Sequence, residues 1–311
     1  MPPRLGALIA IVLWGLSFVA TRLALREISP VTLIFTRFAL GTALLVATLL
    51  VRRRPLVPPL ASWPMLALMG FVGIFFHQLL QSYGLTMTTA VRTGWLIGLI
   101  PIWSALLAGL FLGERFGAVK VVGLAIGFAG AVVVMARGRI GPGFLALPGT
   151  RGDLLILVST LNWAVYSAIG HGTIRRLGSL RATTGAMFLG WLMLAPLFLH
   201  AAGWREYPAL SGAGIAAVLF LGLGASGLGY LFWYGALEKI ETTRVAAFLY
   251  LEPLVTLAAA MALLGEEVHA ATIAGGLMVL GGVALVQRAP GPAKARDSIP
   301  ARQPRDEEIR S

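Results

Sequence analysis

Apolar residues fall into ten long runs along the chain, and polar or turn-forming residues separate them. Each run is close to the roughly 20 residues that an α-helix needs to cross a bilayer. The runs cover residues 5–25, 30–51, 63–83, 91–112, 116–136, 153–174, 181–202, 212–235, 243–264 and 269–287. The pattern predicts an all-α integral membrane protein with ten transmembrane helices. The first run is expected to be a transmembrane helix and not a cleaved signal peptide.

The second half of the chain repeats the first. Residues 92–134 align without a gap on residues 244–286. The shared positions include Arg92 with Arg244, Pro101 with Pro253, Gly113-Glu114 with Gly265-Glu266, and two further glycines. This indicates an internal duplication, with repeats at 1–136 and 153–287, a linker at 137–152 and a tail at 288–311. Because five helices is an odd number, the second repeat must enter the bilayer from the opposite face. We therefore expect two inverted five-helix repeats around a central cavity.

Composition and charge agree with a membrane protein. Apolar residues make up 58% of the chain and charged residues only 12%, about half the charged share of soluble domains. The net charge of +12 lies mostly between the apolar runs, so we expect no nucleic-acid partner.

The basic residues also predict the orientation of the protein. Of the Lys and Arg residues, seventeen fall on the side of the N-terminus and seven on the other side. The positive-inside rule then places both termini in the cytoplasm. We expect the membrane to be the cell inner membrane. The tail is expected to be disordered and solvated, or to touch anionic lipid.

Few polar side chains lie inside the predicted spans, and such residues usually face the interior of a helix bundle. They are Arg37, His77, Gln78, Gln81, Asn162 and Glu252. Arg37 is expected to be the one basic residue inside a span, and no aspartate is expected inside any. His77 and Gln81 are four residues apart and share a helix face. His77 could relay protons or form a hydrogen bond between helices.

Glu252 is the one acidic residue expected deep in a span, near the bilayer midplane. Its counterpart in the first repeat is Ile100, so the duplication alone does not require a carboxylate there. Three roles remain open for it: proton coupling, an ion pair with Arg37, and a neutral hydrogen-bonding role.

Several further residues suggest how the bundle is built. Pro101 and Pro253 should interrupt their helices, either shaping a cavity or only bending the helix. Trp14 and Trp163 are counterparts in the two repeats and either face a cavity or pack. The Gly-Glu pairs are expected to form capped interfacial turns, with paired gates as the alternative. Glycines in the fifth and tenth helices predict close packing, within one molecule or between two copies.

These residues together resemble the drug/metabolite transporter superfamily and its EamA-type members. The resemblance rests on Trp14-Gly15 with Ser17-Phe18, on Arg37-Phe38, and on the doubled spacing from Pro101 and Pro253 to the two Gly-Glu pairs, and it covers residues 5–287. It implies a carrier whose central cavity is lined by helices 1–4 and 6–9, with helices 5 and 10 peripheral. The candidate cavity residues are Trp14, Arg37, His77, Gln81, Tyr83, Trp95, Pro101, Asn162, Trp163, Tyr166, Tyr234, Tyr250, Glu252 and Pro253.

The function expected is secondary active transport, with export of a small organic metabolite or drug-like solute by alternating access. The alternatives are an intramembrane enzyme and a lipid-handling membrane protein. No cysteine, no His-Glu-x-x-His and no phosphate-binding G-x-x-x-x-G-K-[ST] sequence occurs, so no catalytic residue, metal or cofactor is expected. The expected partners are the solute and the lipid bilayer, and the protein should be a monomer or a homodimer.

Overall fold

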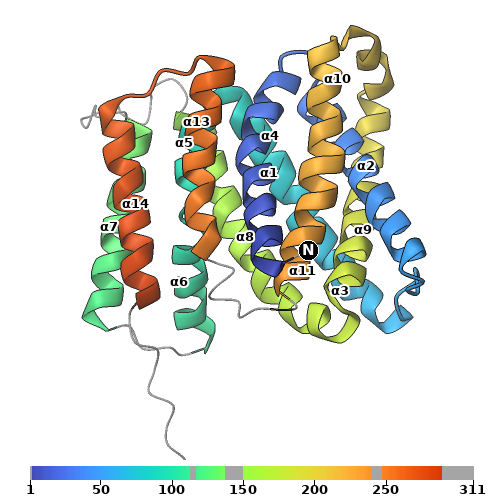
Figure 1. The fold of residues 1–311 in the computed structure, drawn as a ribbon, viewed down its shortest axis with the longest axis horizontal. Helices are drawn as coiled ribbons and strands as arrows, with labels where there is room; N and C mark the ends of the chain where they lie inside the picture. The colour runs from blue at the N-terminus through green and yellow to red at the C-terminus, as the bar shows by residue number, and fades with distance from the viewer. Residues whose placement is uncertain (1, 113–116, 137–149, 238, 240–246, 289–311) are drawn as a thin grey trace, which may run out of the picture.

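The structure is a computed structural model that describes residues 2–112, 117–136, 150–237, 239 and 247–288. The elements of this described part are all helical (Figure 1). The Gly113-Glu114 turn, Arg244, most of the predicted linker and the predicted tail beyond Arg288 lie outside the described residues. We call residues 2–136 the first half and residues 150–288 the second half.

The first half begins with two spans separated by a short turn. Ser29 starts the second span: its hydroxyl accepts a hydrogen bond from the Thr32 amide, and Pro30 takes the first helical position, where a missing N–H costs no bond. The helices are α1 (Pro3–Ala24), α2 (Pro30–Val51), the short η1 (Leu60–Ser62), α3 (Trp63–Gly70), η2 (Phe71–Phe76), α4 (His77–Met87), α5 (Ala90–Ile97), α6 (Ile100–Leu112) and α7 (Ala118–Ala136).

The second half follows the same plan. Its helices are α8 (Thr150–Leu177), α9 (Ser179–His200), η4 (Gly203–Ala209), α10 (Gly212–Leu219), η5 (Phe220–Gly229), α11 (Tyr230–Leu237), η6 (Ala247–Leu251), α13 (Glu252–Leu264) and α14 (Ala270–Arg288). Gly265 ends α13 in the left-handed conformation, with φ of 62°, and this confirms the capped turn predicted there.

Ten spans result, as the apolar runs predict. Nine described helices are at least 18 residues long and apolar enough to cross a membrane, and Phe248–Leu264 supplies a shorter apolar helix. The spans stand side by side in Figure 1. We call the face where α1 begins and α14 ends the terminal face. The opposite face, which carries the turn between α13 and α14, is the distal face.

The two prolines interrupt their spans at matching places. The fourth span is divided into α5 and α6, and Pro101 is the second residue of α6. In the ninth span, the 3-10 helix η6 precedes α13, whose second residue is Pro253. Each proline therefore sits in a first helical turn, where it removes no helical hydrogen bond. Glu252, at the first position of α13, consequently lies at a helix start within the bundle.

Two π-helical segments, η2 and η5, occupy the middle of the third and eighth spans. The apolar pattern does not predict them. Each receives a hydrogen bond from the first span of the other half: Asn162 Nδ2 donates to the Val72 carbonyl at 2.6 Å, and Trp14 Nε1 donates to the Ala225 carbonyl at 3.1 Å. Wide turns of this kind often occur at functional positions. Here they join the two halves.

The helices α7 and α14 pack against each other at one edge of the molecule (Figure 1). A Cβ atom placed on Gly130 would lie 2.5 Å from the Gly275 carbonyl oxygen, and one on Gly123 would lie 2.8 Å from that of Gly282. The backbones therefore approach too closely for side chains. Of the two alternatives for these glycines, packing within one molecule is the one that the structure shows.

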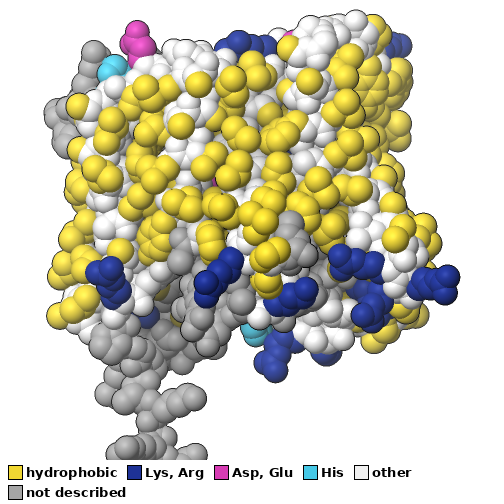
Figure 2. Space-filling view, in the orientation of Figure 1, with side chains coloured by type: hydrophobic (Ala, Val, Ile, Leu, Met, Phe, Trp, Pro, Cys, Tyr) yellow, Lys and Arg dark blue, Asp and Glu magenta, His cyan; other side chains and the backbone are white. Residues whose placement is uncertain are grey.

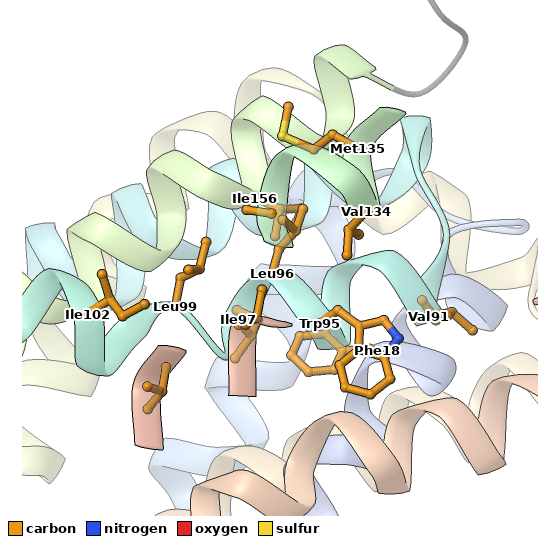
Figure 3. Close-up of a cluster of buried hydrophobic side chains, with 14 of the residues drawn as sticks. Phe18, Val91, Trp95, Leu96, Ile97, Leu99, Ile102, Val134, Met135 and Ile156 are labelled. Carbon is orange, nitrogen blue, oxygen red and sulfur yellow. The ribbon is translucent and has the colours of Figure 1, made fainter. Parts of the chain in front are cut away.

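A hydrophobic cluster packs residues of α5 and α6 against residues of α1, α7, α8, α13 and α14, and Figure 3 shows part of it. Trp95 belongs to this cluster, is only 1% exposed, and packs against Gly276, where any side chain would collide with the indole ring. Figure 3 also shows Phe18, Leu96 and Ile156 in this cluster. Trp95, a candidate cavity residue, thus belongs to the packed core.

Two expectations about charge are wrong. Arg92 lies in the first turn of α5, and Asp153 lies in the first turn of α8, which begins at Thr150. Both are buried, and they form an ion pair. Arg92 Nη2 also donates to the Met135 carbonyl at 3.0 Å, and the Thr88 hydroxyl donates to Asp153. Arg37 is therefore not the only basic residue inside a span, and one span does contain an aspartate. Each charge is tolerated because the other neutralises it.

Candidate functional site

A cavity of about 90 Å³ lies between the two halves of the molecule. Its lining comes from the first four spans and from the sixth, eighth and ninth. The lining residues are Trp14, Ser17, Phe18, Arg37, His77, Gln78, Gln81, Ile97, Ile100, Trp163, Tyr230, Leu249 and Glu252. Six of the fourteen candidate residues therefore meet in one place: Trp14, Arg37, His77, Gln81, Trp163 and Glu252.

Aromatic rings form one wall of this cavity. The Trp14 and Tyr230 rings meet edge to face at 5.6 Å, and the Trp163 and Tyr230 rings do so at 6.3 Å. Tyr230 thus connects the two tryptophans that the duplication pairs. The Trp163 ring also contacts the His77 ring, and the two ring centres are 5.0 Å apart. Such a wall suits a solute with an apolar or ring-bearing body.

Arg37 brings a positive charge to the cavity from α2. The side chain is only 5% exposed, and its Nε donates to the hydroxyl of Ser226 in η5 at 3.0 Å. The guanidinium carbon lies 5.2 Å from the centre of the Phe38 ring. Ser226 holds one nitrogen of the guanidinium group, and no described residue accepts a hydrogen bond from the two terminal nitrogens.

His77 lies at the start of α4, directly after η2. Its Nδ1 is 3.0 Å from the Ser159 carbonyl oxygen. A carbonyl can only accept, so Nδ1 must carry the hydrogen and donate it. This is the hydrogen bond between helices that was one of the two alternatives for His77. Gln81, one turn further along α4, lines the same cavity.

Glu252 is 6% exposed and borders two spaces at once. One is the central cavity, and the other is a smaller pocket of about 20 Å³ that is also lined by Pro101, Tyr250 and Pro253. Both interrupted spans meet at this smaller pocket. Among the described residues, none donates a hydrogen bond to the Glu252 carboxylate and none forms an ion pair with it. The predicted alternative of a pair with Arg37 is absent from this part of the chain.

The remaining candidates lie away from the central cavity. Asn162 is engaged with η2, Tyr166 is 2% exposed against Trp163, and Trp95 is in the core. Tyr83 is 41% exposed on the surface of the bundle. Tyr234 lines a separate small pocket together with Ser179 and Thr183 of α9. No described residue of α9 lines the central cavity, although the resemblance implied a contribution from the seventh helix.

Sequence reasoning missed several lining residues. Ser17 follows Trp14 by three positions and therefore shares its helix face, a signal that was available. Tyr230 precedes Tyr234 by four positions on the same helix, so the aromatic pattern also contained it. Gln78 was among the polar residues within spans but not among the candidates. Ser226 has an ordinary hydroxyl in an apolar segment, and only the contact with Arg37 distinguishes it.

At the distal face, carboxylates of one half bind groups of the other half. Glu266, in the turn after α13, accepts hydrogen bonds from the Ala90 and Val91 amides at 2.9 and 3.0 Å. These amides belong to the first turn of α5, where a helix favours a negative charge. The turn predicted for Gly265-Glu266 thus also caps a helix of the first half.

Two further carboxylates act in the same way. Glu27 accepts from the amide and the hydroxyl of Ser211, both at 2.7 Å, at the start of α10. These hydrogen bonds, first from the hydroxyl and then from the amide, lower the pKa of Glu27 below its ordinary value of 4.5. Glu206 accepts from the amide of Ser29 at 2.6 Å, at the start of α2. With the Arg92–Asp153 pair, four carboxylate contacts connect the halves at this face.

Comparison with known proteins assigns the chain to a family. The model of the EamA-like transporter family matches residues 2–136 and again residues 150–288. An uncharacterized transporter of Archaeoglobus fulgidus is 30% identical over 89% of this chain and 94% of its own. A protein of Streptantibioticus cattleyicolor, described as a probable terminal-alkyne amino-acid exporter, is 29% identical over 95% of this chain and 96% of its own.

A solved crystal structure shares the fold. It superposes with a TM-score of 0.64 at 20% sequence identity, and the match covers 91% of this chain and 96% of that chain. The family match extends over both halves, and relatives cover almost the whole length. This ten-helix multi-pass membrane protein belongs to the EamA-like transporter family.

Proposed function

We propose that the protein is a secondary active exporter that moves a small organic solute by alternating access through the central cavity. The observation that carries the proposal is the composition of that cavity. Its walls come from both halves, with Trp14 and Arg37 from the first and Trp163 and Glu252 from the second. A relative movement of the halves would therefore change access to every group that could hold a solute.

The contacts at the distal face support alternating access. The carboxylates of Glu27, Glu206 and Glu266 each bind backbone amides of the opposite half. Such bonds close one entrance and can be exchanged for bonds to water when the halves separate. The separate family matches to residues 2–136 and 150–288 support two repeats. Their odd number of spans supports an inverted relation between them.

The distribution of basic residues supports an orientation. Figure 2 shows Lys and Arg side chains along the edge that corresponds to the terminal face. Figure 2 also shows some Lys and Arg along the opposite edge. By the bounds of their helices, Arg52, Lys120 and Arg176 lie at the terminal face, whereas the described acidic residues other than Glu252 lie at the distal face. We therefore place the terminal face and both termini in the cytoplasm of a cell whose inner membrane holds the protein, and the distal face outside.

Glu252 is the group that we assign to proton coupling. It is buried at a helix start within the bundle, borders the cavity, and has no described partner to hold it in one charge state. A carboxyl group in such a place can exchange a proton when the cavity changes its access. Its pairing with Arg37 would have argued against this role, and that pairing is absent among the described residues.

Export is the direction that we propose, because the relative from Streptantibioticus cattleyicolor is described as a probable exporter. The test is transport by purified protein in liposomes, with a metabolite panel supplied with and without a pH gradient. Accumulation that depends on the gradient, and that is lost when the cavity is altered, would support the proposal. A protein that moves no solute in either condition, or that moves lipid instead, would contradict it.

A further inference from the structure

Arg37 carries unused hydrogen-bond donors into the central cavity. A guanidinium group has five N–H donors in a planar fork. Only Nε is bonded among the described residues, to Ser226 at 3.0 Å, and no described carboxylate forms an ion pair with Arg37. The side chain lines the cavity although it is 95% buried. Burying a charge without a partner of opposite charge costs free energy. A ligand of opposite charge that binds Arg37 would remove this cost.

Ser226 determines how this fork is presented. It lies in the π-helical segment η5, which packs directly on α2. A Cβ atom on Gly41 would lie 2.8 Å from the Cβ of Ser226, and one on Gly222 would lie 2.6 Å from the Cβ of Leu40. The close approach of these two helices brings the Ser226 hydroxyl to Nε. Because Nε is held, the edge with the terminal nitrogens remains for a ligand.

The neighbouring groups favour an anion at this position. Gln81 and Tyr230 line the same cavity, and each can donate a hydrogen bond. Glu252 is the one described carboxylate in the lining, and it forms no ion pair with Arg37. The aromatic wall of Trp14 and Trp163 offers an apolar surface to the rest of a ligand.

We propose that Arg37, oriented by Ser226, is the anion-binding group of the cavity, and that the transported solute carries a carboxylate on an apolar or aromatic body. The carboxylate accepts two hydrogen bonds from the terminal nitrogens of Arg37, the geometry that guanidinium favours. Ser226 is a positioning residue that acts through Arg37. This inference rests on the proposed transport function and adds the chemical class of the solute.

Four phenyl compounds test the class, because they share a phenylethyl body and differ in the polar groups that it carries. They are 3-phenylpropanoate, phenylalanine, phenethylamine and 3-phenylpropanamide. Binding to the purified full-length protein and transport in liposomes would both be measured. We expect the two carboxylates to bind roughly 10- to 100-fold more tightly than the amine and the amide, the range for charge-assisted bonds. Arg37→Gln should remove this preference. Arg37→Lys, which keeps the charge without the fork, should retain only part of it.

Ser226→Ala tests the positioning role. It should raise the KM for the carboxylates by about 3- to 10-fold, as expected for one lost orienting hydrogen bond, and leave the maximal rate and the amide unchanged. In an Arg37→Gln background it should have no further effect on carboxylate binding, because the two residues act through one contact. Arg22→Gln is the matched control: Arg22 bonds the Leu85 carbonyl outside the cavity and should not alter the preference.

Several results would overturn the inference. They are equal binding of amine and carboxylate by the unaltered protein, loss of all four compounds equally in Arg37→Gln, or no binding of either carboxylate. Transport of phenethylamine alone would refute the anion site and leave the transport function intact. Failure to move any solute of a broad panel would instead contradict the proposed function.

Discussion

Glu266 provides a direct test of closure at the distal face. The Glu266→Gln substitution keeps the shape of the side chain and one carbonyl oxygen, but removes the negative charge. The two amides of α5 that Glu266 now holds, at 2.9 and 3.0 Å, can then share only one acceptor. The side chain also loses its attraction to the start of the helix. We expect the closed arrangement to be weakened relative to an open one.

The size of the effect follows from the number of bonds. A hydrogen bond to a charged group contributes about 1.5–3 kcal/mol when shielded from water, and the helix start adds about 0.3–1 kcal/mol. Glu266 is partly exposed, so solvent reduces both contributions. A loss of about 1–2 kcal/mol remains, which raises the open fraction about 5- to 30-fold.

The absence of cysteine from the chain makes this change easy to measure. Ser17, which lines the cavity, would be replaced by cysteine as the single reactive thiol. Its labelling by a membrane-impermeant maleimide would be followed in vesicles of each orientation. On the proposed orientation, Glu266→Gln should speed labelling from the distal side about 5- to 30-fold, in proportion to the open fraction.

Glu267→Gln is the matched control, because Glu267 is the exposed neighbour and no hydrogen bond joins it to α5 among the described residues. It should leave the labelling rate unchanged. An unchanged rate in Glu266→Gln, or an equal increase in both variants, would refute the closing role of this contact. Faster labelling from the terminal side alone would show that the closure lies elsewhere.

Three further predictions concern the cavity, the coupling and pH. Trp163→Ala should reduce transport more than it lowers the yield of folded protein. Trp63, which is exposed at the first position of α3, is expected to anchor that helix at the membrane interface, so Trp63→Ala should mainly lower yield; parallel losses in both variants would indicate packing instead. Glu252→Gln should abolish gradient-driven accumulation but preserve solute exchange, and normal accumulation would disprove proton coupling. The lowered pKa of Glu27 means that its contact with Ser211 stabilises the fold above about pH 4.5 and is lost as pH falls through the lowered value. The difference in Tm between the native protein and Glu27→Gln should therefore disappear in acid, and a difference that persists there would contradict this.

Much of the scaffold could be predicted because it depends on local sequence. A span needs a continuous apolar run, and each run is visible without knowledge of its neighbours. Pro101 and Pro253 mark breaks for a similarly local reason, since proline cannot continue a helical bond pattern. The glycines of α7 and α14 predicted close packing. Only the structure shows that the partner is in the same molecule.

The contacts between the halves could not be predicted in the same way. Glu266 and Ala90 are separated by 176 positions, and nothing in the periodicity of either segment points to the other. Arg92 was expected on the outer side of the bilayer, and no aspartate was expected inside a span. Their burial becomes acceptable only as a pair. Likewise, the π-helical segments depend on donors such as Asn162 that arrive from the opposite half.

The site departs from the symmetry of the scaffold. Trp14 and Trp163 are counterparts, and so are the two interrupted helices, so the frame of the cavity is duplicated. The ionisable groups are not: Glu252 has Ile100 as its counterpart, and the second half has no arginine that matches Arg37. An inverted repeat gives two equivalent halves that can exchange roles as the cavity opens to either side. Chemistry that recognises one solute needs one arrangement of charges at the shared cavity. The duplication therefore accounts for the movement that we propose. Arg37 and Glu252 have no matching charged residue in the other half, so selectivity and coupling should be sought at these two residues.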